Sequence, residues 1–111
     1  MARSAPTDVL AAYATAVYAR DVNALLALYH PDVTVYDMWE QWLYDGQPAW
    51  RGMVEGWFGS LGDERVQVTF DDVRTTVTPD MATVHAFVTY AGLSAGGERL
   101  RAMNNLSLIH I

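Results

Sequence analysis

The sequence contains no cysteine, no lysine and no long apolar run. The absence of cysteine excludes disulfides, thiolate zinc sites and cysteine nucleophiles. No stretch has the roughly 20 apolar residues that cross a bilayer, and Pro6 and Asp8 interrupt the N-terminus before a signal segment could form. We therefore expect a cytoplasmic protein without a membrane partner.

Basic residues are also scarce. Seven arginines stand against 13 acidic residues, so the net charge is −6 at pH 7. Such a chain repels a phosphate backbone, and nucleic acid is not expected as a partner. The three histidines are far apart and lack metal-ligand spacing, so we expect neither a metal site nor a cofactor.

The chain has 111 residues, of which 51% are hydrophobic. This length predicts one domain, large enough to bury a core without disulfides. Helical spacing predicts a helix from Thr7 to about Arg20, a shorter one capped by Asp21 and stopped before Pro31, and a third from Pro48.

Alternating apolar residues predict strands in the remainder of the chain. These strands are expected from residue 32, at 43–44, at 65–78, at 81–90 and from residue 98 onward. The alternation of the long strand changes phase near Asp71 and Asp72, which predicts a bulge there. The element order predicts an α+β fold with three helices in its N-terminal half, packed on one face of a curved antiparallel sheet.

Asp37 is the most informative residue. The period of two places its carboxylate on the same face as Val33, Val35 and Trp39, which otherwise marks the core. A carboxylate buried there needs partners, and such anomalies gather at functional sites because a desolvated carboxylate is a stronger base. The alternative is that the strand ends at Tyr36 and Asp37 begins a turn.

Tyr13 lies in the apolar stripe of the first helix, so its hydroxyl needs a partner. An ordinary core tyrosine bonded to a backbone carbonyl is the alternative. Three further aromatic residues, Trp39, Trp57 and Phe58, are expected to line an apolar pocket, unless they only fill the core. His85 can line the same pocket as an acid or base, or can be a structural histidine.

Residues 12–37 and 46–52 resemble the SnoaL-like and ketosteroid-isomerase-like families of the nuclear-transport-factor-two-like superfamily. The resemblance implies a cone of curved antiparallel sheet closed by helices around a pocket. It also implies that Tyr13 is an oxyanion-hole tyrosine and that Asp37 is the general base. Asn104 falls at the position of a second oxyanion donor, where the isomerase pattern has a protonated aspartate; this departure argues against isomerase activity proper.

The last six residues, 106–111, match one reading frame of a transposon-end adapter used for sequencing libraries. We therefore expect a SnoaL-like domain over residues 1–105, without the last strand of the family, followed by a non-native tail. The alternative is a natural ending that continues the strand.

Together these observations predict an enzyme that removes a proton next to a carbonyl of a small apolar molecule, by isomerisation, cyclisation or dehydration. The rival prediction is a non-catalytic module that binds a ligand or forms a homodimer. Its dimer interface would use the other face of the first strand, where Thr34, Tyr36 and Met38 lie.

Overall fold

The computed structural model describes residues 7–37 and 41–110 of the chain. Its elements, in chain order, are α1 (Asp8–Ala19), α2 (Val22–Leu26), β1 (Thr34–Tyr36), β2 (Leu43–Asp45), α3 (Gln47–Ser60), β3 (Arg65–Val77), β4 (Ala82–Leu93) and β5 (Arg99–His110). Each predicted helix and strand is present, and the bounds differ by a few residues at most. None of the helices in the described ranges is both long and apolar enough to cross a bilayer.

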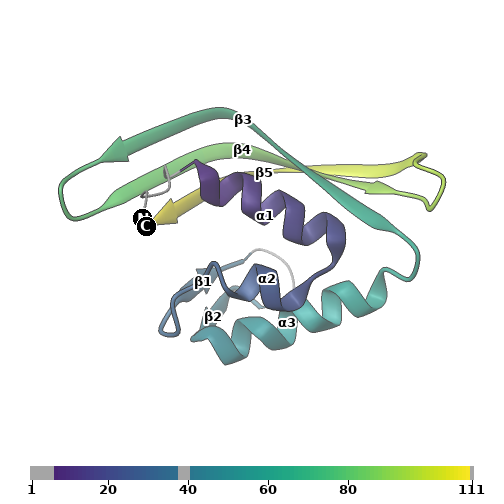
Figure 1. The fold of residues 1–111 in the computed structure, drawn as a ribbon, viewed down its shortest axis with the longest axis horizontal. Helices are drawn as coiled ribbons and strands as arrows, with labels where there is room; N and C mark the ends of the chain where they lie inside the picture. The colour runs from purple at the N-terminus through teal and green to yellow at the C-terminus, as the bar shows by residue number, and fades with distance from the viewer. Residues whose placement is uncertain (1–6, 38–40, 111) are drawn as a thin grey trace.

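The three long strands form an antiparallel sheet in the order β3–β4–β5. Figure 1 shows this sheet curving over α1, with α2, α3 and the small β1–β2 hairpin on the far side of that helix. Among the described strands, β3 and β5 are the two edges, so the sheet is open. The predicted α+β class and the curved antiparallel sheet are confirmed.

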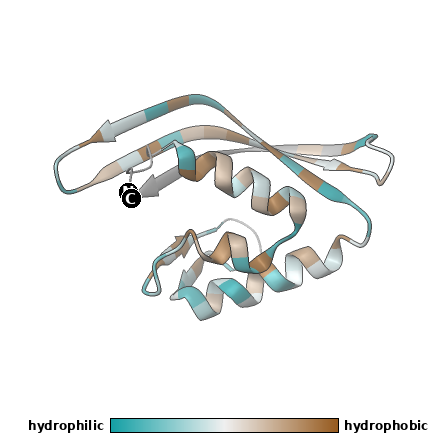
Figure 2. Ribbon diagram, in the orientation of Figure 1, coloured by the Kyte–Doolittle hydropathy of each residue, from teal (hydrophilic) through white to brown (hydrophobic). Residues whose placement is uncertain are grey.

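The core lies between the sheet and the helices. Helix α1 packs on β3 and on α2, and the side chains of Val17, Leu25 and Val54 are completely buried there. In the first half of β4 the buried residues alternate along one face and are Ala82, Val84, Ala86 and Val88; Ala91 is buried further along the strand. Figure 2 shows that α1 and α2 are more apolar along their length than α3, which carries more hydrophilic residues. The helical face of the sheet is thus the inner face.

Local hydrogen bonds position the segments around this core. The Asp21 carboxylate accepts from the Ala24 N–H at 3.0 Å, which is the predicted cap of α2. The Gln47 amide donates to the carbonyls of Leu26 and Tyr29 at 3.0 and 2.9 Å. Gly46 has a φ of 90°, a backbone conformation that favours glycine, and this turn leads β2 directly into α3. These contacts fasten the end of α2 to the start of α3.

The predicted irregularity in β3 is confirmed. The register between β3 and β4 shifts between Asp71 and Arg74, and Asp72 has a φ of 51°. Because a bulge bends its strand, β3 changes direction there, and residues 71–77 are all exposed. Only the part of β3 before the bulge packs on the helices.

Residues 106–110, expected to be a non-native tail, form the end of β5. Their backbone pairs with residues 83–87 of β4. This pairing describes their conformation, and the origin of the segment stays a prediction.

Replacement of a buried valine in the sheet tests where the core lies. Val88→Ala in β4 removes methyl groups from a side chain that is 2% exposed, and we expect the free energy of unfolding to fall by about 2–3 kcal/mol. The matched control is Val77→Ala in β3, where the side chain is 65% exposed, and the change should stay within about 0.5 kcal/mol. Urea denaturation measures both, and equal losses would contradict the inner face assigned to β4.

Candidate functional site

Asp37 follows directly after β1 and is half-buried. Its backbone N–H donates to the Trp42 carbonyl at 3.0 Å, so the antiparallel pairing of the hairpin continues through this residue. The neighbouring strand residues alternate as expected, since Val35 packs on the core and Tyr36 is exposed. β1 ends at Tyr36, as the alternative had it, and Asp37 directly after it is half-buried.

Tyr13 meets a second tyrosine from the sheet. The hydroxyl oxygens of Tyr13 in α1 and Tyr90 in β4 lie 3.0 Å apart, and either can be the donor. The Tyr13 ring packs edge-on against Phe70, and the Tyr90 ring packs edge-on against Trp57, each with centroids 6.2 Å apart. The Tyr13 hydroxyl is therefore bonded to another side chain, not to the backbone carbonyl of an ordinary core tyrosine.

Electrostatics link the carboxylate to these phenols. Burial raises the pKa of Tyr13 well above its usual value, and Tyr90, Tyr29 and Asp37 raise it further. Burial also raises the pKa of Tyr29 to about 12, although the adjacent Trp50 side chain lowers it. For Tyr90 burial is again the main cause of a raised pKa, with the Tyr13 hydrogen bond lowering it and Asp37 raising it. All three phenols are thus neutral hydroxyl groups near neutral pH, within the field of one carboxylate.

We call Asp37, Tyr13, Tyr29 and Tyr90 the phenol cluster. Sequence reasoning missed Tyr29 and Tyr90 as members. A signal was present, since Tyr90 continues the buried face of Val84, Ala86 and Val88 and ends it with a polar tip. The residues come from segments that are far apart in the chain, so only the fold shows that they meet.

The other predicted site residues lie in different places. Trp57 packs on Tyr90 beside the phenol cluster, whereas Phe58 is 6% exposed and belongs to the hydrophobic core. Trp39 lies outside the described residues. Asn104 pairs through its backbone with Thr89, and its side chain is outside the described part of the structure.

The placement of His85 corrects an expectation. It was grouped with Thr83, Phe87 and Thr89 on one strand face, and that grouping agrees with the alternation of β4. This face points away from the helices, since His85 is exposed and Phe87 is 53% exposed. His85 therefore does not line the phenol cluster.

Two surface cavities, of about 440 and 400 Å³, lie apart from the phenol cluster. The first is lined by Arg20 and Arg65, among others, and the second by residues of α1 together with Asp21 and Ala24 at the start of α2. Neither is lined by Tyr13 or Asp37. Within the described ranges, no three His, Asp or Glu side chains are close enough together to hold a metal ion.

The raised phenol pKa values predict a loss of stability in alkali. The pKa of Tyr29 rises from 10.0 to about 12, so its contribution is fully present below pH 10 and is lost as the pH rises through 12. Between these values each such phenol should lower the free energy of unfolding by about 1.4 kcal/mol per pH unit. In urea denaturation series from pH 9 to 11.5, Tyr29→Phe and Tyr13→Phe should each show a shallower fall than the wild type. A fall as steep as the wild type's would contradict the burial of these hydroxyl groups.

Solved structures share this fold at low sequence identity. A protein described as a candidate calcium/calmodulin dependent protein kinase II association domain from Xanthomonas campestris aligns with a TM-score of 0.77 and 10% identity, over 94% of this chain and 71% of that one. Aln2 from a Streptomyces species aligns with a TM-score of 0.75 and 14% identity, over 98% and 80%. An NTF2-like protein of unknown function from Pseudomonas putida aligns with a TM-score of 0.68 and 16% identity, over 90% and 81%. At these identities the likeness shows the fold alone.

The sequence itself points to one family. No curated protein is significantly similar to this chain. The profile of the SnoaL-like domain, however, matches residues 10–109, which includes Tyr13, Asp37 and Tyr90. The solved structures, among them the NTF2-like protein from Pseudomonas putida, share its fold. Since the profile match spans most of the chain, this protein belongs to the SnoaL-like domain family.

Proposed function

We propose that the protein is an enzyme that removes a proton next to a carbonyl group of a small, mainly apolar molecule. The observation that carries this proposal is the phenol cluster, in which the half-buried Asp37 acts electrostatically on three partly buried tyrosines. A half-buried carboxylate is a suitable base for a weakly acidic C–H bond. Neutral phenols beside it can donate to an oxygen that becomes negative.

The proposed reaction begins when the Asp37 carboxylate takes a proton from the carbon adjacent to the carbonyl. The electron pair of that C–H bond forms a carbon–carbon double bond, and the carbonyl oxygen becomes an enolate. Tyr13 donates its hydroxyl proton to this oxygen in a hydrogen bond. A positioned base contributes roughly 10²–10⁴-fold to the rate, and one oxyanion donor about 3 kcal/mol.

Three reactions can follow from this enolate. Return of the proton to a different carbon gives isomerisation, and attack of the enolate carbon on a second carbonyl gives cyclisation. Loss of a hydroxide from the neighbouring carbon, protonated as it leaves, gives dehydration.

The apolar part of such a substrate would contact Trp57, because the Trp57 ring packs on Tyr90 beside the phenol cluster. Asn104, expected as an additional donor, pairs with Thr89 on the strand face of His85, which points away from the helices, so it is not included in this reaction.

Replacement of Asp37 by asparagine tests the base. The apolar ketone 2-tetralone in D₂O is a suitable probe, with deuterium uptake at the carbon next to the carbonyl followed by proton NMR. We expect Asp37→Asn to lower the rate of catalysed exchange by at least about 100-fold, since the amide is not a base. The matched control is Asp45→Asn, at an exposed position of β2, which should keep the wild-type rate.

The stability of Asp37→Asn separates the enzyme from a structural role. If the carboxylate is an active-site base, its removal should leave the free energy of unfolding unchanged or higher. If it only holds the hairpin, unfolding should become easier by about 1–3 kcal/mol. Unchanged exchange together with that loss would refute the proposed chemistry.

A second candidate function is an association module, and an exposed aromatic pair favours it. The side chains of Tyr36 and Trp42 on the β1–β2 hairpin are 70% and 71% exposed, and their ring centroids lie 5.6 Å apart. Exposed rings of this size are common at protein interfaces. Two structural neighbours are described as candidate kinase association domains. We propose a homodimer through this face of β1; Met38, expected on the same face, lies outside the described residues.

Sedimentation at several concentrations tests the homodimer. The wild-type chain should sediment as a dimer at micromolar concentration, and Trp42→Gln should weaken self-association by about tenfold or more, because large aromatic residues dominate interface energies. Val77→Gln on β3, whose side chain is 65% exposed, is the control and should leave the dimer intact. A wild-type monomer, or a Trp42→Gln dimer of unchanged strength, would exclude this interface.

A further inference from the structure

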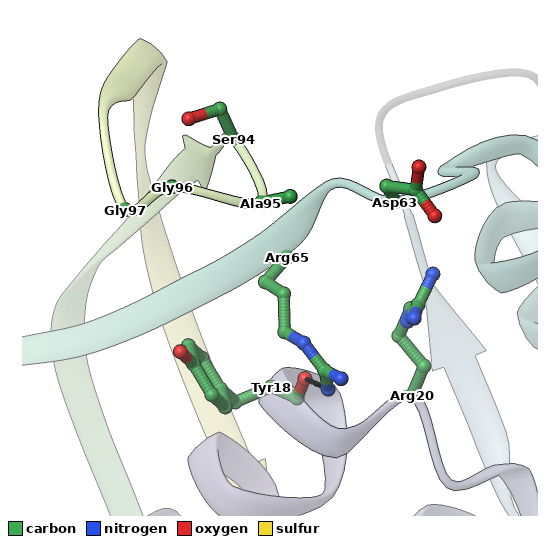
Figure 3. Close-up of a pocket in the computed structure, with 8 residues that line it drawn as sticks. All are labelled: Tyr18, Arg20, Asp63, Arg65, Ser94, Ala95, Gly96 and Gly97. Carbon is green, nitrogen blue, oxygen red and sulfur yellow. Dashed lines mark hydrogen bonds between the residues drawn. The ribbon is translucent and has the colours of Figure 1, made fainter.

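A polar cavity of about 440 Å³ lies at the far end of α1 from the N-terminus. Three segments line it: the end of α1 with Tyr18 and Arg20, the start of β3 with Asp63 and Arg65, and the turn of residues 94–97 between β4 and β5. Figure 3 shows both arginine side chains between the helix and β3, with Asp63 above the end of Arg20. The phenol cluster shares no residue with this cavity.

Arg65 is held in place by Tyr18. One of its guanidinium N–H groups donates to the Tyr18 carbonyl at 2.9 Å, and the guanidinium carbon lies 5.4 Å from the centre of the Tyr18 ring. The dashed line in Figure 3 marks this hydrogen bond. A guanidinium has several N–H donors in one plane, so a single bond to a carbonyl leaves others available to a ligand. The side chain is therefore preorganised and still able to donate.

Arg20 is anchored in the same way. Its guanidinium donates to the carbonyl of Gly62, which precedes β3, and its backbone has a φ of 56° at the end of α1. Two of the seven arginines of this acidic chain thus converge on one cavity. Paired guanidinium groups are the arrangement that proteins use to bind oxyanions in a planar, bidentate geometry.

The turn opposite the arginines adds small residues and a hydroxyl. The Ser94 hydroxyl oxygen accepts from the Glu98 N–H at 3.1 Å, which leaves its own proton to donate. Gly97 has a φ of 85°, so the turn itself requires glycine there. A side chain at Gly96 would meet only the Ser94 hydroxyl, at 3.9 Å, so packing does not require glycine at this position. No bulky side chain of residues 94–97 therefore separates the backbone of this turn from a small ligand in the cavity.

We propose that this cavity binds a small carboxylate monoanion, held by Arg20 and Arg65. The charges of the lining residues select this class: two arginines and Asp63 sum to one positive charge, which matches a single negative charge better than a phosphate dianion. The Tyr18 ring, 47% exposed, offers an apolar wall for the body of the ligand. An aromatic or short aliphatic carboxylate fits both features.

Titration with sodium benzoate, followed by ¹H–¹⁵N NMR at constant ionic strength, tests the proposal. We expect saturable shifts of the backbone amides of residues 94–97, with a dissociation constant in the millimolar range. Arg20→Gln should weaken binding by about tenfold, since a charge-assisted pair of hydrogen bonds is lost. The control is Arg74→Gln, which removes the same charge from an exposed arginine that pairs with Asp72, and it should bind benzoate like the wild type.

Asp63→Asn gives an independent test in the opposite direction. Removal of the like charge should tighten benzoate binding several-fold. Shifts that never saturate, or that are the same in Arg20→Gln as in the wild type, would overturn the site. Tighter binding of inorganic phosphate than of benzoate would overturn the assignment to a monoanion. If Arg65→Gln fails to fold because it fastens the helix to β3, Arg20→Gln and Asp63→Asn still decide the question.

Discussion

Burial of α1 beneath the curved sheet is the interaction on which the rest of the structure depends. This helix packs on β3 and α2, and its Val17 is completely buried. The same docking brings Tyr13 to the hydroxyl of Tyr90, and it brings the end of the helix to Arg65. The docking of this one helix thus positions both the phenol cluster and the polar cavity. The two sites have no residue in common.

The phenol cluster combines a half-buried carboxylate with three partly buried tyrosines. Asp37 acts electrostatically on all three tyrosines, and these neutral hydroxyl groups do not neutralise its charge. The arginines Arg20 and Arg65 are bonded to backbone carbonyls at the end of α1 and the start of β3. The proposed base and the proposed anion site therefore use opposite charges in separate parts of the molecule. Although this acidic chain has only seven basic residues, two of them line the proposed anion site and neither belongs to the phenol cluster.

Local patterns accounted for most elements and for part of the site. The Asp21 cap and the bulge beside Asp72 followed from the sequence, since both depend on residues adjacent in the chain. Tyr13 and Asp37 were singled out because each places a polar group on an apolar face, and the family resemblance gave their expected roles. Tyr29 and Tyr90 were missed because their relation to Asp37 depends on contacts across the fold. The face of His85 was misjudged because alternation groups residues without telling which face the helices cover.

The sequence by itself determined the periodicities, the caps, the charge and the two polar groups on apolar faces, because these are local properties of the chain. Only the tertiary structure decided which face of β4 became the inner face, which phenols Asp37 acts on electrostatically and which arginines share a cavity. The physical reason is that these relations arise when segments distant in the chain bury their apolar surface together, and the geometry of that packing is not written in any single segment.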